Sequence, residues 1–281
     1  MYNIDKILEP YRQIQKMFES QREKFKFAEE VRAKHESFVL PLISIQKSFE
    51  NITKISQILA DSSIQKYFEQ FKNIGQKINE HLKKTPESLI LLANYGWYLN
   101  FDSRFNLPNK LGQLIREDKI EEVDEFLIEY YNENIDRMFN DLSNHFPERK
   151  EIFIQILASH KKKQYYLTIP CVLAQIDGIC FDSTTRKFFI KEKKNKDFRF
   201  LPEIAEEFAN ITSSIADAFS RPIFNQMPIS AHESKLDNFP VQLNRHLIMH
   251  GIDKNYGDEK NSLKCISLLF YLSDMLTLID K

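Results

Sequence analysis

The chain has 281 residues, enough for one large domain or two small ones. Its 42% apolar and 28% charged residues are typical of a globular protein. With 39 basic and 40 acidic residues the net charge is -1, so no global charge draws the chain to nucleic acid or a membrane surface. Three cysteines without a CxxC pair argue against a disulfide framework or a zinc site.

The N-terminus lacks the apolar run of a signal peptide, and the chain holds no stretch of about 18 apolar residues that could span a membrane. Together with the cysteine usage, this predicts a cytoplasmic protein with reduced thiols and no membrane contact. The chain also has only six glycines and ten prolines. The prolines fall at intervals that suit helix starts, because proline is tolerated in a first helical turn and disfavoured inside a helix. We therefore predict an all-α fold.

Residues 1–84 predict an amphipathic helical arm. Apolar side chains recur every three or four residues in three consecutive stretches, with Lys, Glu and Gln between them. The three apolar stripes are Tyr11, Ile14, Phe18 and Phe25; Leu42, Ile45, Phe49, Ile52 and Leu59; and Ile64, Tyr67, Phe68, Phe71, Ile74, Ile78 and Leu82. Ordinary helix packing and a coiled-coil-like arm for a partner or second subunit are both open at this point.

Residues 85–281 predict a helical domain. Helices are expected at residues 120–146, 147–163, 165–180 and 202–219, and from Asp258 to about Ile279. The segment YYLTIPCVLAQIDGIC is apolar on nearly all sides, which predicts a central, buried helix. Any strand should be confined to residues 181–200, where the basic run STTRKFFIKEKKNKDFRF lacks helical spacing. In the last helix Asp258 is a suitable N-cap, and the buried stripe is Leu263, Ile266, Leu269, Phe270 and Leu276.

The stretch LNRHLIMHG places an arginine and two of the seven histidines, Arg245, His246 and His250, directly before a glycine. It predicts a short helix that ends at Gly251, a residue suited to a left-handed position after a helix. His250 then lies in the last turn, where the helix dipole favours a protonated imidazole. Arg245 and His250 are about 140° apart around the axis and about 7.5 Å apart along it, so they flank a groove, whereas His246 and His250 share a face.

An arginine near a histidine suits the cleavage of a phosphodiester bond. Histidine titrates near neutral pH and can move a proton at a 2′-hydroxyl or at a leaving oxygen. Arginine keeps its charge and binds phosphate oxygens through its planar fork, which stabilises charge that develops in the transition state. RNA supplies its own nucleophile, so this chemistry needs neither a metal nor a cofactor.

Four nearby residues are candidates for RNA contacts. Asn255 and Tyr256 lie in an NYG turn after the predicted short helix, and Tyr256 could stack on a base. Asn261 and Lys264 begin the last helix close to the Arg–His cluster, where Lys264 is a candidate phosphate contact. A purely structural turn and a solvated lysine are the alternative interpretations.

The spacing R-x4-H alone is weak, because about one match is expected by chance in a chain of this composition. The context adds a polar residue after the arginine, a helix stop after the histidine and the NYG turn. With this context the segment resembles the R-x4–6-H motif of the HEPN superfamily, helical-bundle domains found in many prokaryotic toxins and phage-defence proteins. The segments GWYL, YYNENIDRMF, FPERKEIF and IPCVLAQIDGI resemble uncharacterised bacterial proteins that share this tail, so the resemblance covers about residues 86–281.

The resemblance implies a HEPN-type bundle over residues 85–281 and a metal-independent endoribonuclease, a toxin or abortive-infection effector that acts on RNA as a homodimer without a cofactor. Two Arg–His pairs would face each other across a composite cleft. Arg245 would be the phosphate clamp, His250 the proton-transfer residue and His246 a polar helper. An antitoxin or another defence-system protein is the further partner that this role implies. Residue 252 is Ile, so the H-x-Y extension of one subgroup is absent.

Two other interpretations are open from the sequence. A non-catalytic helical interaction or RNA-binding scaffold protein would use the same helices without needing the Arg–His pair, as inactive members of the superfamily do. His246 and His250 could also chelate a divalent metal, but no Glu lies between them and a third ligand is only a guess, so no metal site is predicted. Asp177, inside the apolar segment, is expected to be buried, with a helix-capping, hydrogen-bonding or catalytic role.

Overall fold

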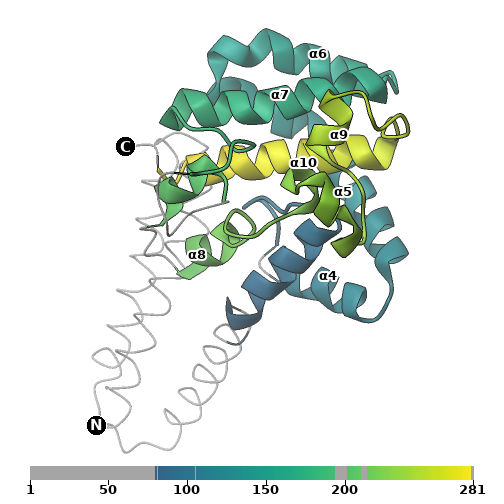
Figure 1. Cartoon of the computed structure of the whole chain (residues 1–281), viewed down its shortest axis with the longest axis vertical. Coiled ribbons are helices and arrows are strands. Elements are labelled where there is room, and N and C mark those ends of the chain that lie inside the picture. The colour runs from purple at the N-terminus through teal and green to yellow at the C-terminus, as the bar shows by residue number, and fades with distance from the viewer. Residues whose placement is uncertain (1–79, 81, 105, 194–200, 210–213, 280–281) are drawn as a thin grey trace, which may run out of the picture. The chain divides into compact units, whose positions relative to one another are not determined.

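The computed structural model describes residues 80, 82–104, 106–193, 201–209 and 214–279. These residues belong to one compact unit, Leu59–Lys281. They form helices and connecting loops without a strand, and their only β-bridge joins Lys191 to Pro202. The predicted all-α fold is confirmed for this part of the chain (Figure 1). The helical arm predicted over residues 1–84 lies almost wholly outside the described residues, and its predicted boundary falls inside a helix that covers residues 82–94.

The elements labelled in Figure 1 follow one another along the chain after this helix. The α-helices are α4 (Leu107–Arg116), α5 (Ile120–His145), α6 (Lys150–Lys161), α7 (Tyr165–Thr184), α8 (Ser214–Ser220), α9 (Arg245–Met249) and α10 (Glu259–Leu276). Short 3-10 helices lie between them at η1 (Pro147–Arg149), η2 (Glu203–Phe208), η3 (Pro228–Ser230) and η4 (Glu233–Asn238). None of the described helices has the length and apolar character needed to cross a membrane.

Proline marks helix starts at several of the predicted places. Pro108 lies in the first turn of α4, and Pro147 and Pro228 begin η1 and η3. There the missing N–H removes no intrahelical hydrogen bond. Pro170 is different because it lies inside α7. Within the helix predicted over residues 202–219, Glu203–Phe208 is a 3-10 helix rather than an α-helix, Ser214–Ser220 is α8, and residues 210–213 lie outside the described residues.

The central helix of the domain is α10 rather than α7. Every residue of α10 from Ser262 to Ser273 is buried, and the helix packs most extensively against α7 and also against α5. The main partner of α10 is α7. This helix also contacts α6, but it exposes Tyr166, Leu167 and Phe181 to solvent. The expected helix at residues 165–180 is therefore confirmed, but its expected burial on nearly all sides is wrong, because α7 turns one face to solvent. The small Ser and Cys residues that interrupt the apolar positions of α10 let it pack on all sides.

An extended segment, residues 97–101, runs along α10 and has no strand partner among the described residues. Side chains of α10 satisfy its backbone, because Tyr98 donates its N–H to Ser267 Oγ at 3.2 Å and Phe101 donates to Asp274 Oδ2 at 2.8 Å. Trp97, Tyr98 and Leu99 are all buried. The segment thereby closes one side of the core and sets the place of α5, whose Tyr131 hydroxyl donates to the Tyr98 carbonyl.

Candidate functional site

The short helix that carries the Arg–His cluster is held by a buried asparagine. Asn244, with 0% of its surface exposed, caps α9 by accepting the Leu247 N–H at 3.2 Å. Its amide group donates to the carbonyls of Pro228 at 2.7 Å and Ala231 at 3.0 Å, which ties α9 to η3. The helix begins only at Arg245, because these contacts place the residue before it in extended backbone.

The end of α9 is the glycine stop that the sequence predicts. His250 is the C-terminal cap residue and Gly251 has a φ of +69°, the left-handed conformation that favours glycine. The carbonyl of Leu247 then accepts the N–H groups of Ile252 at 2.9 Å and Asp253 at 3.2 Å. This turn reverses the chain and leaves the side chains of His246 and His250 exposed to solvent.

Arg245 is half-buried against α7 and the loop that follows it. Its Nη2 atom lies 3.9 Å from Asp177 Oδ2, beyond hydrogen-bond distance, and its guanidinium carbon lies 5.2 Å from the ring centre of Phe189. Its Nε atom is buried without a hydrogen-bond partner. A planar cation with five donors is therefore oriented by its surroundings but keeps donor capacity unused within the described residues.

Asp177 links Arg245 to the loop after α7. Its Oδ1 atom accepts the N–H groups of Phe188 at 3.0 Å and Phe189 at 2.9 Å, which fixes the ring on which Arg245 rests. Burial raises the pKa of the Asp177 carboxyl, and the hydrogen bond from Phe189 and the charge of Arg245 oppose that rise. The structure shows a hydrogen-bonding role for Asp177, and its side chain is 18% exposed rather than fully buried.

The two histidines of the cluster lie together. The ring centres of His246 and His250 are 4.3 Å apart with the planes tilted by 58°, as the i, i+4 spacing predicts. Arg245 extends instead toward Asp177 and Phe189, and no contact joins it to His250. One copy of the chain thus presents a pair of exposed imidazoles along one face of α9, whereas its guanidinium extends toward α7.

The predicted RNA-contacting residues of the turn have structural partners. The Tyr256 hydroxyl donates to the Tyr166 carbonyl at 3.2 Å, and the two rings pack edge-to-face at 5.1 Å between centres. Gly257 makes this possible, since a Cβ there would lie 2.4 Å from the Tyr166 ring. Asn261 donates to the Tyr256 carbonyl and to Asp258, the N-cap of α10. Asn255 remains exposed.

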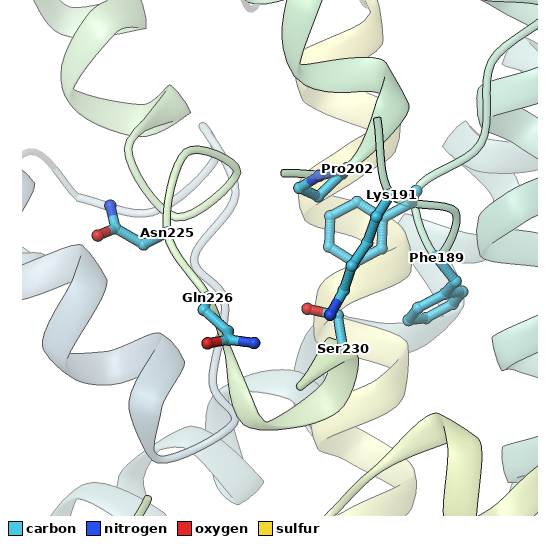
Figure 2. A pocket seen from close by; sticks show the side chains of 7 residues that line it. Phe189, Lys191, Pro202, Asn225, Gln226 and Ser230 are labelled. Atoms are coloured by element: carbon cyan, nitrogen blue, oxygen red, sulfur yellow. The ribbon is translucent and has the colours of Figure 1, made fainter. Parts of the chain in front are cut away.

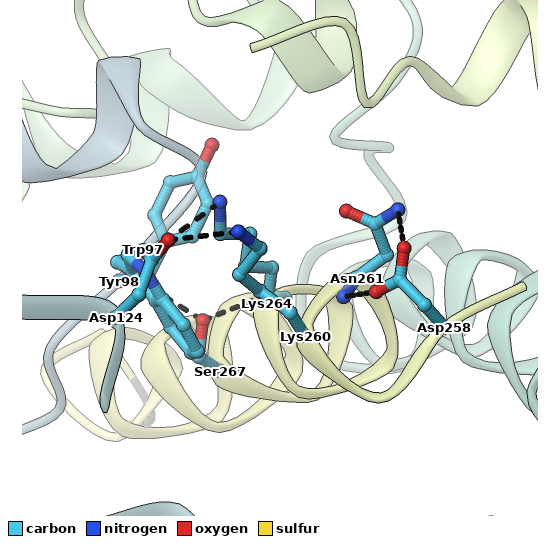
Figure 3. Close-up of polar contacts among 8 residues, drawn as sticks. All are labelled: Trp97, Tyr98, Asp124, Asp258, Lys260, Asn261, Lys264 and Ser267. Carbon is cyan, nitrogen blue, oxygen red and sulfur yellow. Dashed lines mark hydrogen bonds and ion pairs between the residues drawn. The ribbon is translucent and has the colours of Figure 1, made fainter. Parts of the chain in front are cut away.

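Lys264 lies in the interior, which corrects its prediction as an RNA contact. The residue is only 3% exposed. Its Nζ atom lies 3.9 Å from Asp124 Oδ1 and 5.5 Å from the ring centre of Trp97. Asp124 also accepts from Trp97 Nε1 at 2.7 Å and from Lys260 Nζ at 2.9 Å (Figure 3). Burial lowers the pKa of Lys264 to about 8, although the charge of Asp124 acts in the opposite direction. A lysine so enclosed cannot reach a phosphate.

The described residues contain no group of three or more His, Cys, Asp or Glu side chains placed to hold a metal ion. Two hollows adjoin the cluster and differ greatly in size. One lies beside Phe189, between Lys191 and Gln226 (Figure 2), and has a volume of about 10 Å³, enough for about one water molecule. The other is a groove of about 460 Å³ beside α9, in the range of sites that hold small ligands.

No protein-family model, curated protein or solved structure matches this chain. The geometry therefore has to be interpreted from its own residues. Sequence reasoning missed the contacts of Arg245 with Asp177 and Phe189, because they join segments about 60 residues apart and leave no local pattern. It also missed the groove, whose lining residues are individually ordinary loop residues.

Proposed function

We propose that this protein is a metal-independent endoribonuclease that cleaves RNA through its 2′-hydroxyl group, in the manner of HEPN-type toxins or abortive-infection effectors. The observation that carries the proposal is the arrangement at α9. Two exposed imidazoles 4.3 Å apart follow an arginine whose side chain is 32% exposed and makes no hydrogen bond among the described residues. Exposed His side chains can exchange protons with a ligand, and an oriented arginine with unused donors can bind phosphate oxygens.

In this mechanism His250 accepts the proton of the 2′-hydroxyl, and the 2′-oxygen attacks the adjacent phosphorus. The new bond joins phosphorus to the 2′-oxygen, and the bond from phosphorus to the 5′-oxygen breaks. His246, whose ring lies beside that of His250, protonates the departing 5′-oxygen. Arg245 binds the phosphate oxygens and stabilises their developing charge. The products are a 2′,3′-cyclic phosphate and a 5′-hydroxyl.

The proposal includes a homodimer in which two Arg–His pairs share one cleft. It is supported by the arrangement within one chain, where Arg245 extends toward α7 and makes its ion pair with Asp177 and its ring contact with Phe189. A second copy would supply the missing half of the site. Light scattering at micromolar concentration should give the mass of two chains, and a monomeric mass would count against this part of the proposal.

The decisive experiment measures RNA cleavage by the purified protein and its variants. His250→Ala should lower the rate by about two to four orders of magnitude, the usual contribution of general acid–base catalysis. Arg245→Lys should also be impaired by about tenfold or more, because an ammonium group cannot reproduce the bidentate fork. His232→Ala and Arg221→Lys change an exposed histidine and an exposed arginine elsewhere, and both should retain activity.

The chemistry gives two further readouts in the same assay. Cleavage should survive EDTA, and a substrate with a 2′-deoxy sugar at the scissile nucleotide should resist because its nucleophile is missing. Activity that is lost on chelation and restored by a divalent ion would contradict this mechanism and favour a metal site at His246 and His250.

A non-catalytic interaction or RNA-binding protein is the second candidate. The contacts of Arg245 with Asp177 and Phe189 favour it, since they give the arginine a role in holding a loop. In that case the purified protein does not cleave RNA. His250→Ala then leaves any toxicity of the expressed protein unaltered.

A further inference from the structure

The groove of about 460 Å³ beside α9 has the composition of a ligand site. The segment before α9, the helix itself, the turn after it and the start of α10 all contribute to it. The lining residues that matter for recognition are Gln242, Leu247, Ile252, Asp253, Asn255 and Asn261. Sites for small ligands typically combine an apolar wall with a few placed polar groups, and this lining does so.

The apolar wall is formed by Leu247 and Ile252. Ile252 is 56% exposed although it is a large apolar residue, and it lies directly after the glycine that stops α9. A flat ring system that packs on this side chain would remove apolar surface from water, and single-stranded nucleic acid offers such rings when its bases are unstacked.

The polar side of the groove is held in place by hydrogen bonds. Asp253 Oδ1 accepts the Asn255 N–H at 2.8 Å, and the Asp253 N–H donates to the Leu247 carbonyl at 3.2 Å. The Asn261 amide is tied to Tyr256 and Asp258. These contacts orient the second carboxylate oxygen of Asp253 without occupying it, so a ligand need not order the turn when it binds.

We propose that this groove binds a nucleobase that carries an exocyclic amino group. The inference rests on the proposed ribonuclease function, because the groove and His250 belong to the same turn. An ionised carboxylate can only accept hydrogen bonds. Asp253 therefore favours adenine, cytosine or guanine, whose exocyclic amino groups donate, over uracil, whose single ring donor, N3–H, lies between two carbonyl oxygens that a carboxylate repels. The groove would then select the nucleotide that is presented to Arg245 and His250.

The test titrates AMP, CMP, GMP and UMP into the full-length protein by ligand-observed NMR. These probes have no phosphodiester bond between nucleotides, so binding is measured apart from cleavage. The tightest of AMP, CMP and GMP should bind about tenfold more tightly than UMP, as expected for one hydrogen bond to a charged group. Asp253→Asn should abolish this preference, because its amide can still accept from Asn255 but offers a donor to the base.

Asp118→Asn provides the matched control, since Asp118 is an exposed aspartate at the end of α4 and the substitution changes charge equally. Ile252→Ser is a second variant on the exposed apolar wall, and it should weaken all four probes. Equal binding of UMP, no saturable binding of any probe, or an unchanged preference in Asp253→Asn would overturn the inference. Selective binding by a protein that does not cleave RNA would uphold the groove and remove only the ribonuclease proposal.

Discussion

The domain contains two groups of polar side chains, one around the start of α10 and one around α9, and the two groups differ in how they are partnered. Around the start of α10, Asp124, Lys260 and Lys264 form a group whose charges are partnered with one another and with Trp97 (Figure 3). Around α9, His246 and His250 are exposed, and their rings lie 4.3 Å apart. Arg245 has one distant ion pair and an Nε without a partner.

The difference follows from the cost of burying a charge. A charge taken out of water must be paired and hydrogen-bonded, so Asp124 and Lys264 are held together in the interior and removing either partner disturbs the fold. Water reaches the imidazoles of His246 and His250, and a ligand can replace that water without breaking an ion pair or a side-chain hydrogen bond. Chemical function is therefore expected at α9 and stability at Lys264, although both groups looked alike as basic residues near one motif.

Asp124→Asn should produce the largest difference between the two regions. It leaves the buried ammonium of Lys264 without its counter-ion, which should lower the free energy of unfolding by about 3 kcal/mol. His250→Ala removes an exposed side chain and should change that free energy by no more than about 0.5 kcal/mol. Urea denaturation of the wild type and both variants measures these changes in the free energy of unfolding. Similar losses in the two variants would mean that α9 is also a structural element.

Lys264→Met should produce a smaller effect, a change in how the free energy of unfolding depends on pH. Because the pKa of Lys264 is lowered to about 8 from its ordinary value of 10.5, the unfolded chain binds a proton between these pH values that the folded chain has released. The free energy of unfolding of the wild type should therefore rise with pH through this window. Below about pH 8, Lys264 is protonated in both the folded and the unfolded chain, and burial of its ammonium then lowers the free energy of unfolding by the full amount.

The contribution of Lys264 between pH 7.5 and 9.5 should amount to about 1–2 kcal/mol of unfolding free energy. Lys264→Met should lack this rise, since it keeps the length of the side chain and removes the titrating group. Lys260→Met is the matched control, because Lys260 also pairs with Asp124 but is 46% exposed. A rise that persists in Lys264→Met would show that another group causes it.

The sequence by itself determined the local features of this protein. Helical periodicity and proline placement predicted the all-α fold, Gly251 was predicted to end α9 in a left-handed conformation, and Asp258 was predicted to cap the last helix. These features depend on residues within a few positions of one another, where backbone preference and spacing are sufficient. The roles of Arg245 and His250 stay predictions.

Only the tertiary structure decided which residues are accessible. It placed α10 rather than α7 at the centre, enclosed Lys264 between Asp124 and Trp97, and set Arg245 against Asp177 and Phe189. It also assembled the groove beside α9 from separate segments. Burial and long-range pairing arise from contacts between residues far apart in the chain. The same lysine is therefore a surface residue or an interior one according to which helix packs over it.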